Sequence, residues 1–246
     1  MNRLFDAFSR ANKTLALVGG AVRDELLGGE RCETSERKDL DFATDALPDD
    51  IEAILRDEGL STHDVGRRWG TIGTQLRTPL GDIQDVQITT FRGETYTPNS
   101  RHPEVTFGST LAEDLGRRDF TVNAIAKLAD GTLVDPHHGR TDLATRTLRP
   151  VGDAHRMLSD DPLRMLRAAR FAASHGLKPT ADLVDAMHRK AHSLLRISRE
   201  RWLLELDKLL VAEHASMGLK LLLDTRILGL ILPEVAAMVD FHLESE

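Results

Sequence analysis

The feature that most constrains this chain is a hydrophobic run that ends in two glycines and is followed by a pair of aspartates. Gly19 and Gly20 close the run, and Arg23 lies three positions after the second glycine. Further along, Asp39 and Asp41 flank one leucine beside other apolar residues. Since side chains i and i+2 of a strand point to the same face, the sequence predicts two carboxylates side by side.

Two neighbouring carboxylates repel each other unless a cation lies between them. Hard oxygen ligands favour Mg²⁺, which in enzymes commonly also holds substrate phosphates. Glycines let backbone N–H groups approach a phosphate, and an arginine clamps its oxygens. We therefore predict phosphate binding by Gly19, Gly20 and Arg23, and Mg²⁺ binding by Asp39 and Asp41. Each motif taken alone also fits an ordinary tight turn or an acidic surface strand.

Length, cysteine content and charge limit the classes of protein to which this chain can belong. The 246 residues are enough for one large domain or two smaller ones, and a single cysteine excludes an intrachain disulfide. With no signal-peptide pattern and no membrane-spanning run, we expect a cytoplasmic protein. The net charge of −7 is uneven, because residues 140–205 hold 13 Lys and Arg against 8 Asp and Glu. That segment predicts either a contact with a polyanion or a solvated helical surface.

The two halves of the chain have different patterns. Up to about residue 150, short apolar runs alternate with Gly, Pro and Asp turns, whereas from residue 154 the apolar spacing is helical. This predicts an α+β domain over 1–150 and a helical region over 151–246, with the boundary near Pro150. Expected strands cover 16–18, 40–43, 70–76, 83–91, 105–107 and 132–134; expected helices cover 51–56, 111–115, 120–128, 157–176, 181–195, 198–211 and 217–225.

A second motif is Arg117-Arg118-Asp119 at the start of the expected helix over 120–128. Arginine is electrostatically disfavoured at a helix N-terminus, which favours a functional reason for the pair. The alternative is a surface cluster of salt bridges.

A third motif begins at Asp160-Asp161-Pro162 and continues into an amphipathic helix. Asp161, Arg164, Arg167 and Arg170 recur every three residues, so we expect them along one side of that helix, opposite an apolar side. The pattern fits a solvated basic face, but three arginines behind an acid favour a ligand surface.

Together these motifs resemble those of the class II tRNA nucleotidyltransferase and bacterial poly(A) polymerase family, within the polymerase-β-like nucleotidyltransferase superfamily. The matching segments lie between about residues 15 and 235, and are 19–24 with 39–41, 117–123, 160–164, and 198–201 with Glu205. The resemblance implies a head domain with a mixed catalytic sheet and an all-helical neck and body. It also implies Mg²⁺-dependent, template-independent addition of CMP and AMP, from CTP and ATP, to a tRNA 3′ end.

The resemblance further implies a role for each motif. It assigns two metal ions to Asp39 and Asp41, nucleotide phosphates to Gly20 and Arg23, ribose to Arg118 and Asp119, and base selection to Asp161 and Arg164 with help from Arg167 and Arg170. Cytosine and adenine both present an amino donor beside a ring-nitrogen acceptor, so a carboxylate and a guanidinium can select them against uracil and guanine.

This sequence departs from the family pattern at a few positions. Gln87 stands where a glutamate is usual, five residues before Arg92, and Asp85 lies two residues earlier. Asp160 replaces a glutamate, Asn99 replaces an aspartate, and the chain ends where the family continues into further helices. The motifs leave open a poly(A) polymerase, a CC-adding or an A-adding enzyme. Gln87 alone supports another class, an RNA-binding member with impaired catalysis.

Overall fold

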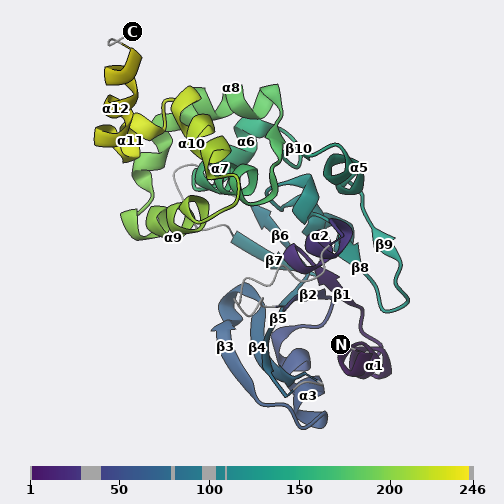
Figure 1. Cartoon of the computed structure of the whole chain (residues 1–246). Coiled ribbons are helices and arrows are strands. Elements are labelled where there is room, and N and C mark those ends of the chain that lie inside the picture. The colour runs from purple at the N-terminus through teal and green to yellow at the C-terminus, as the bar shows by residue number, and fades with distance from the viewer. Residues whose placement is uncertain (1, 29–39, 79–80, 96–103, 109, 244–246) are drawn as a thin grey trace. The chain divides into compact units, whose positions relative to one another are not determined.

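The computed structural model describes residues 2–28, 40–78, 81–95, 104–108 and 110–243 (Figure 1). Its contacts divide the chain into two compact units, residues 1–140 and 141–246. The first is built on a mixed sheet and the second is mostly helical, so the predicted α+β class is confirmed. The predicted boundary near Pro150 stays a prediction.

Seven strands form the sheet of the first unit in the order β3-β4-β5-β2-β1-β8-β9. Strands β2 and β5 run parallel, and the other neighbouring pairs are antiparallel. Strands β6 and β7 pair separately. The bounds are β1 Leu15–Val18, β2 Leu40–Thr44, β3 Thr62–Gly66, β4 Thr71–Arg77, β5 Ile83–Thr90, β6 Arg92–Thr95, β7 Glu104–Phe107, β8 Ala126–Lys127 and β9 Leu133–Val134.

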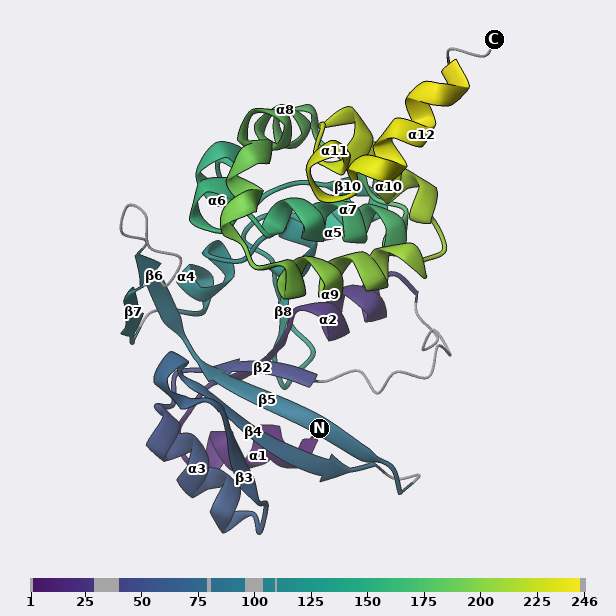
Figure 2. The ribbon, with the colours of Figure 1, turned by 90° about the vertical axis from the view of Figure 1, so that its left-hand side faces the viewer.

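Helices cover both faces of this sheet. Figure 2 shows α1 and α3 on one side and α2 on the other. Their bounds, with those of the shorter helical segments, are α1 Asn2–Arg10, α2 Gly20–Leu26, α3 Pro48–Asp57, η1 Arg67–Trp69, α4 Leu111–Gly116 and η2 Thr121–Asn123.

One part of the core lies between the sheet and helices α1 and α3. Helix α1 buries Leu4 and Phe8, which are one helical turn apart, and the rings of Phe5 and Phe42 meet edge to face at 5.7 Å. Strand β5 buries every second residue from Val86 to Thr90. The alternate residues of the two parallel strands, which include Asp41 and Gln87, therefore point to the opposite face of the sheet.

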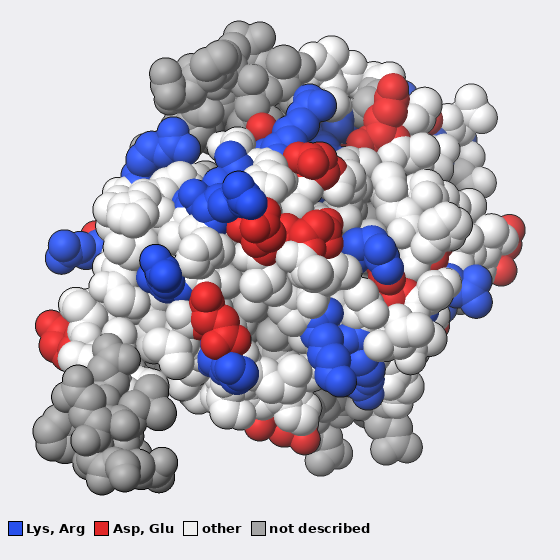
Figure 3. Space-filling model, turned by 90° about the horizontal axis from the view of Figure 1, so that it is seen from above, with Lys and Arg blue, Asp and Glu red and all other residues white. Residues whose placement is uncertain are grey.

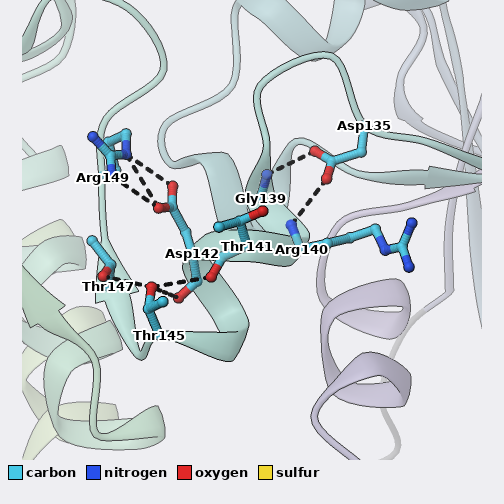
Figure 4. A network of polar contacts seen from close by, with 8 residues as sticks. All are labelled: Asp135, Gly139, Arg140, Thr141, Asp142, Thr145, Thr147 and Arg149. Atoms are coloured by element: carbon cyan, nitrogen blue, oxygen red, sulfur yellow. Dashed lines mark hydrogen bonds and ion pairs between the residues drawn. The ribbon is translucent and has the colours of Figure 1, made fainter.

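The chain passes from one unit to the next through α5 (Gly139–Ala144). Figure 4 shows Asp135 accepting hydrogen bonds from the backbone N–H groups of Gly139 and Arg140, at 2.7 and 3.0 Å, at the start of this helix. In the second unit, the buried carboxylate of Asp142 accepts from Nε and Nη2 of Arg149. This pairing raises the pKa of Arg149 above its usual value.

The second unit packs around helix α7. Helices α9 and α10 pack against it, and Gly218 of α10 permits a close approach, because a Cβ there would lie 2.6 Å from the carbonyl oxygen of Ala169. The bounds are β10 Thr147–Leu148, α6 Ala154–Asp160, α7 Arg164–His175, β11 Lys178–Pro179, α8 Ala181–Lys190, η3 Ala191–Arg196, α9 Arg199–Leu210, α10 Ala215–Asp224, α11 Leu228–Ile231 and α12 Pro233–Leu243.

Two expected helices are wrong. The helix expected over 157–176 is interrupted, because Asp161 is extended before Pro162, and α7 begins only at Arg164. The helix expected over 120–128 is a short 3₁₀ turn followed by β8, which pairs with β1. A continuous apolar run does not distinguish a helix from a buried strand, and here the hydrogen bonds to β1 favour the strand.

Among the residues that the structure describes, no helix is both long and apolar enough to cross a membrane.

Candidate functional site

Residues of the aspartate pair and of the Arg117-Arg118-Asp119 motif lie beside the glycine turn between β1 and α2. Gly19 makes this turn with a φ of 72°, which L side chains rarely adopt. A Cβ on Gly19 would lie 3.6 Å from Nη1 of Arg118 and 3.8 Å from Oδ2 of Asp41. The backbone conformation is therefore what requires glycine, and the turn has a carboxylate and a guanidinium beside it.

Asp41 is exposed on β2 and is the cross-strand partner of Gln87 on β5. Partners in register on neighbouring strands point to the same face. Asp39, the other predicted metal ligand, lies outside the described residues. Asp85, two positions before Gln87, accepts a hydrogen bond from Nε2 of Gln75 at 2.8 Å.

Arg23 is buried, with 8% of its surface exposed. Its Nη1 donates to Oδ1 of Asn123 at 2.7 Å, and its Nε donates to Oδ1 of Asp24 at 2.9 Å. The guanidinium also lies close to the turn, because a Cβ on Gly20 would be 3.4 Å from Nη2. The predicted phosphate-binding arginine is therefore fixed on both sides by protein side chains.

The arginine pair lies at a helix C-terminus, which corrects the expectation that it opens a helix. Helix α4 ends at Gly116 and Arg117 is its C-cap, where a positive charge is favourable. The buried carboxylate of Asp114 accepts from Arg117 Nη2 at 2.6 Å and from Arg118 Nη2 at 3.0 Å. Burial alone would raise the pKa of Asp114, but the two guanidinium groups outweigh it and hold that pKa below its usual range.

Asp119, the predicted ribose contact, is 7% exposed. Its Oδ1 accepts from the backbone N–H of Phe120 at 2.8 Å and from Nδ2 of Asn123 at 3.0 Å. Asp114 and Asn123 were not predicted as site residues. The spacing of Asp114 four residues before Arg118 was a usable signal, whereas nothing local to Asn123 indicates its contact with Arg23.

In the second unit, Asp161 lies between α6 and α7 and is not a part of the arginine helix. Its Oδ1 accepts from the backbone N–H of Leu163 at 3.0 Å, and its Oδ2 lies 3.4 Å from Nη2 of Arg201 on α9. Arg164, the other predicted base-reading residue, is the first residue of α7. The turn at Pro162 thus brings the two predicted residues to the start of this helix.

Arg167 and Arg170 share one carboxylate on α9. Arg170 Nε donates to Oε2 of Glu205 at 2.6 Å, and Arg167 Nη1 lies 3.7 Å from Oε1. Both guanidinium groups lie over the ring of Phe171. Figure 3 shows basic and acidic side chains interspersed on the face of the molecule that it draws.

The family model described as "Poly A polymerase head domain" matches residues 15–149, which is more than half of the chain. The chain belongs to this family. The resemblance inferred from the motifs is thereby confirmed. A second model, described as "Probable RNA and SrmB- binding site of polymerase A", matches residues 176–239 of this family member.

Proteins similar to this chain in sequence or structure are named as CCA-adding enzymes and a tRNA nucleotidyltransferase. A CCA-adding enzyme of Bacillus pumilus is 38% identical over 211 residues, which are 85% of this chain and 49% of that protein. The crystal structure of the Bacillus stearothermophilus CCA-adding enzyme in complex with CTP aligns with a TM-score of 0.78 and 37% identity, covering 92% of this chain and 51% of that one. A tRNA nucleotidyltransferase complexed with a primer tRNA and an incoming ATP analogue aligns with a TM-score of 0.74 and 27% identity, covering 93% and 62%. This poly(A) polymerase family chain thus spans about half the length of the curated relatives it matches.

The described part of this family member holds no cluster of three or more His, Cys, Asp and Glu side chains suited to a metal ion. The predicted metal ligands are the two carboxylates of Asp39 and Asp41, of which only Asp41 lies within the described residues. The chemistry of the donors fits magnesium, since a carboxylate beside a glycine turn supplies the hard oxygen ligands that this ion prefers.

Proposed function

We propose that this chain is the nucleotidyltransferase part of an enzyme that adds CMP and AMP, taken from CTP and ATP, to the 3′ end of tRNA without a nucleic-acid template. One observation carries the proposal: Gly19, Asp41 and Arg118 meet at a single turn. The similarity to a CCA-adding enzyme solved with CTP supports it. The single cysteine fits a reducing compartment such as the cytoplasm.

In the reaction, the 3′ hydroxyl of the RNA attacks the α-phosphate in line, and pyrophosphate leaves. We assign the phosphates to Gly19, Gly20 and Arg23, since the turn offers backbone N–H groups and the guanidinium lies against it. Asp39 and Asp41 would hold two Mg²⁺ ions, which when bound lower the pKa of the attacking hydroxyl and neutralise the triphosphate.

We assign the ribose to Arg118 and Asp119, whose side chains are fixed by Asp114 and Asn123. A guanidinium donates and a carboxylate accepts, so together they complement the hydroxyl groups of the sugar. A deoxyribose would leave one of these polar groups unpaired, which costs affinity.

Base selection is assigned to the helical region over 151–246, with the head over 1–150 carrying the chemistry. A carboxylate accepts from the amino group that cytosine and adenine share, and a guanidinium donates to the adjacent ring nitrogen. Asp161 and Arg164 supply this pair at the start of α7. Glu205 orients Arg167 and Arg170, which assist.

The test is to incubate the purified chain with Mg²⁺, a tRNA that ends in the discriminator base, and each labelled nucleoside triphosphate in turn. We expect addition from CTP first and from ATP only after two C residues, with UTP and GTP unused. Sequencing of the products separates CCA addition from a poly(A) tail and from CC or A addition alone. RNA binding without any addition would support the impaired RNA-binding member instead, for which Gln87 is the relevant departure.

A further inference from the structure

The side-chain amide of Asn123 lies between two residues of the candidate site that are distant in sequence. Arg23 Nη1 donates to Asn123 Oδ1 at 2.7 Å, and Asn123 Nδ2 donates to Asp119 Oδ1 at 3.0 Å. The exposed fractions are 8% for Arg23 and 7% for both Asn123 and Asp119. In such a buried chain of hydrogen bonds, a group left unpaired costs more than a solvated one.

The chemistry of the two neighbours fixes the orientation of the amide. A guanidinium has no acceptor and an ionised carboxylate has no donor. Asn123 must therefore turn its oxygen toward Arg23 and its nitrogen toward Asp119. A carboxylate at position 123 would satisfy the first neighbour and repel the second.

Each neighbour also has a second partner, which for Asp119 donates to the same Oδ1 atom as Asn123 does. Asp24 accepts from Nε and Nη2 of Arg23, at 2.9 and 2.8 Å. The backbone N–H of Phe120 donates to Asp119. The amide of Asn123 therefore links a guanidinium beside the glycine turn to a carboxylate of the arginine motif.

We propose that Asn123 is a positioning residue that holds Arg23 in register with Asp119, so that the triphosphate and the ribose of a nucleotide are recognised together. The proposal rests on the proposed function, which assigns phosphates to Arg23 and ribose to Asp119. In this proposal, Asn123 does not contact the substrate. Its consequence is that discrimination between ribose and deoxyribose depends on the polarity of this buried amide.

The experiment measures binding, which does not depend on turnover. Isothermal titration of the full chain with CTP, dCTP and inorganic tripolyphosphate in Mg²⁺ gives the affinity for the phosphates and the ratio of CTP to dCTP affinity. Asn123→Asp keeps an acceptor for Arg23 but removes the donor to Asp119. We expect tripolyphosphate affinity to stay within about twofold, and the CTP to dCTP ratio to fall about tenfold, the effect of one lost hydrogen bond in a buried site.

A pH profile distinguishes positioning from general damage. A protonated carboxyl group carries one donor and one acceptor, as the amide does. Among the described residues, the charged groups hydrogen-bonded to Asn123 are Arg23 and Asp119, and Asp24 pairs with Arg23. In Asn123→Asp, the CTP to dCTP ratio should therefore recover as the pH is lowered, relative to the wild type at the same pH.

Two further variants complete the test. Asn123→Ser is too short to reach both neighbours, so tripolyphosphate affinity and the CTP to dCTP ratio should both fall. Thr90→Val is the control, since it removes a buried hydrogen bond to the carbonyl oxygen of Ala46 in the same unit without touching the site. The control should lower the melting temperature and leave the ratio unchanged.

The proposal is overturned if Asn123→Asp and Asn123→Ser melt cooperatively and keep the wild-type ratio, or if Thr90→Val reduces the ratio equally. A wild-type chain that binds CTP and dCTP equally overturns this inference and the assignment of ribose to Arg118 and Asp119, while leaving the proposed addition of CMP and AMP standing. A wild-type chain that binds neither nucleotide removes the proposed function and the inference with it.

Discussion

Asp41 and Gln87 are cross-strand partners on the parallel strands β2 and β5. Since partners in register point to the same face, Gln87, which stands where the family usually has a glutamate, lies on the same face of the sheet as Asp41. An amide oxygen can bind a metal ion, but an amide cannot accept a proton from a hydroxyl group.

The first prediction concerns this amide. Gln87→Glu should raise the rate of nucleotide addition or leave it nearly unchanged, because a metal ion can lower the pKa of the hydroxyl unaided. Asp85→Asn should lower the rate of addition only slightly, because Asp85 already accepts a hydrogen bond from Gln75. Single-turnover addition rates check both. A collapse of activity in a folded Asp85→Asn variant would mean that Asp85 is the missing carboxylate.

The second prediction concerns the metal pair. Asp39→Ala and Asp41→Ala should each abolish addition, with a loss larger than the roughly hundredfold that removal of an outer-shell partner of a metal site costs. Asp41 is exposed, so its removal should leave the circular dichroism spectrum and the melting temperature unchanged. Measurable turnover in either variant contradicts the assignment.

The third prediction concerns base selection. Asp161→Ala should let UTP and GTP compete with CTP and ATP, because losing one hydrogen-bond partner in a binding site costs on the order of 1–3 kcal/mol, or about tenfold to a hundredfold in selectivity. Competition assays with paired labelled nucleotides measure this. Slow addition with unchanged preference would instead identify Asp161 as the residue that fixes the turn to Leu163 and Arg201.

The fourth prediction concerns Asp114 and pH. Its pKa is lowered in the folded state, so it stabilises the fold above its unfolded pKa of about 3.9, and this contribution is lost as the pH falls through the folded pKa. Asp114→Ala removes the buried carboxylate that pairs with two partly buried guanidinium groups and should cost about 3 kcal/mol at neutral pH. Urea unfolding as a function of pH checks this, and the gap from wild type should narrow only below about pH 4. A gap that is independent of pH would contradict an ionic origin.

The fifth prediction concerns helix packing. Gly218→Ala should destabilise the helical unit by about 1–3 kcal/mol, because the new methyl group would overlap the Ala169 carbonyl oxygen. Gly229→Ala in α11 is the matched control, with no atom within 4 Å of the new methyl group. It should be neutral or stabilising by up to about 1 kcal/mol. Thermal unfolding of both variants checks this prediction. Equal losses of stability in the two variants would mean that contact with α7 is not the cause.

The sequence predicted the glycine turn and the strands β1, β2, β4, β5 and β9 of the sheet from local signals, but it did not predict β3 or β8. Alternating burial along β5 and the glycines after β1 are visible in a short window. The errors occur where distant residues decide. Residues 126–127 form a strand because β1 offers them an open edge, and Arg117 caps α4 instead of opening a helix.

The site residues, too, were predictable where the signal is local and not where a distant contact sets their environment. The sequence motifs predict Asp41, Arg118 and Asp119 as site residues, and the structure brings the first two to one turn. Spacing did not reveal that Arg23 is buried against Asn123, since a contact across a hundred positions of sequence leaves no trace in a single chain. Such contacts depend on the packing of α2 against η2.

The pairing of β1 with β8 has a consequence for synthesis on the ribosome. Val18 emerges early, but its partner Ala126 emerges only when most of the first unit has been made. Until then, one edge of β1 presents unpaired backbone groups that other strands can bind. A nascent head therefore depends on protection of this edge, and truncations that end before Ala126 should aggregate instead of yielding a smaller soluble domain.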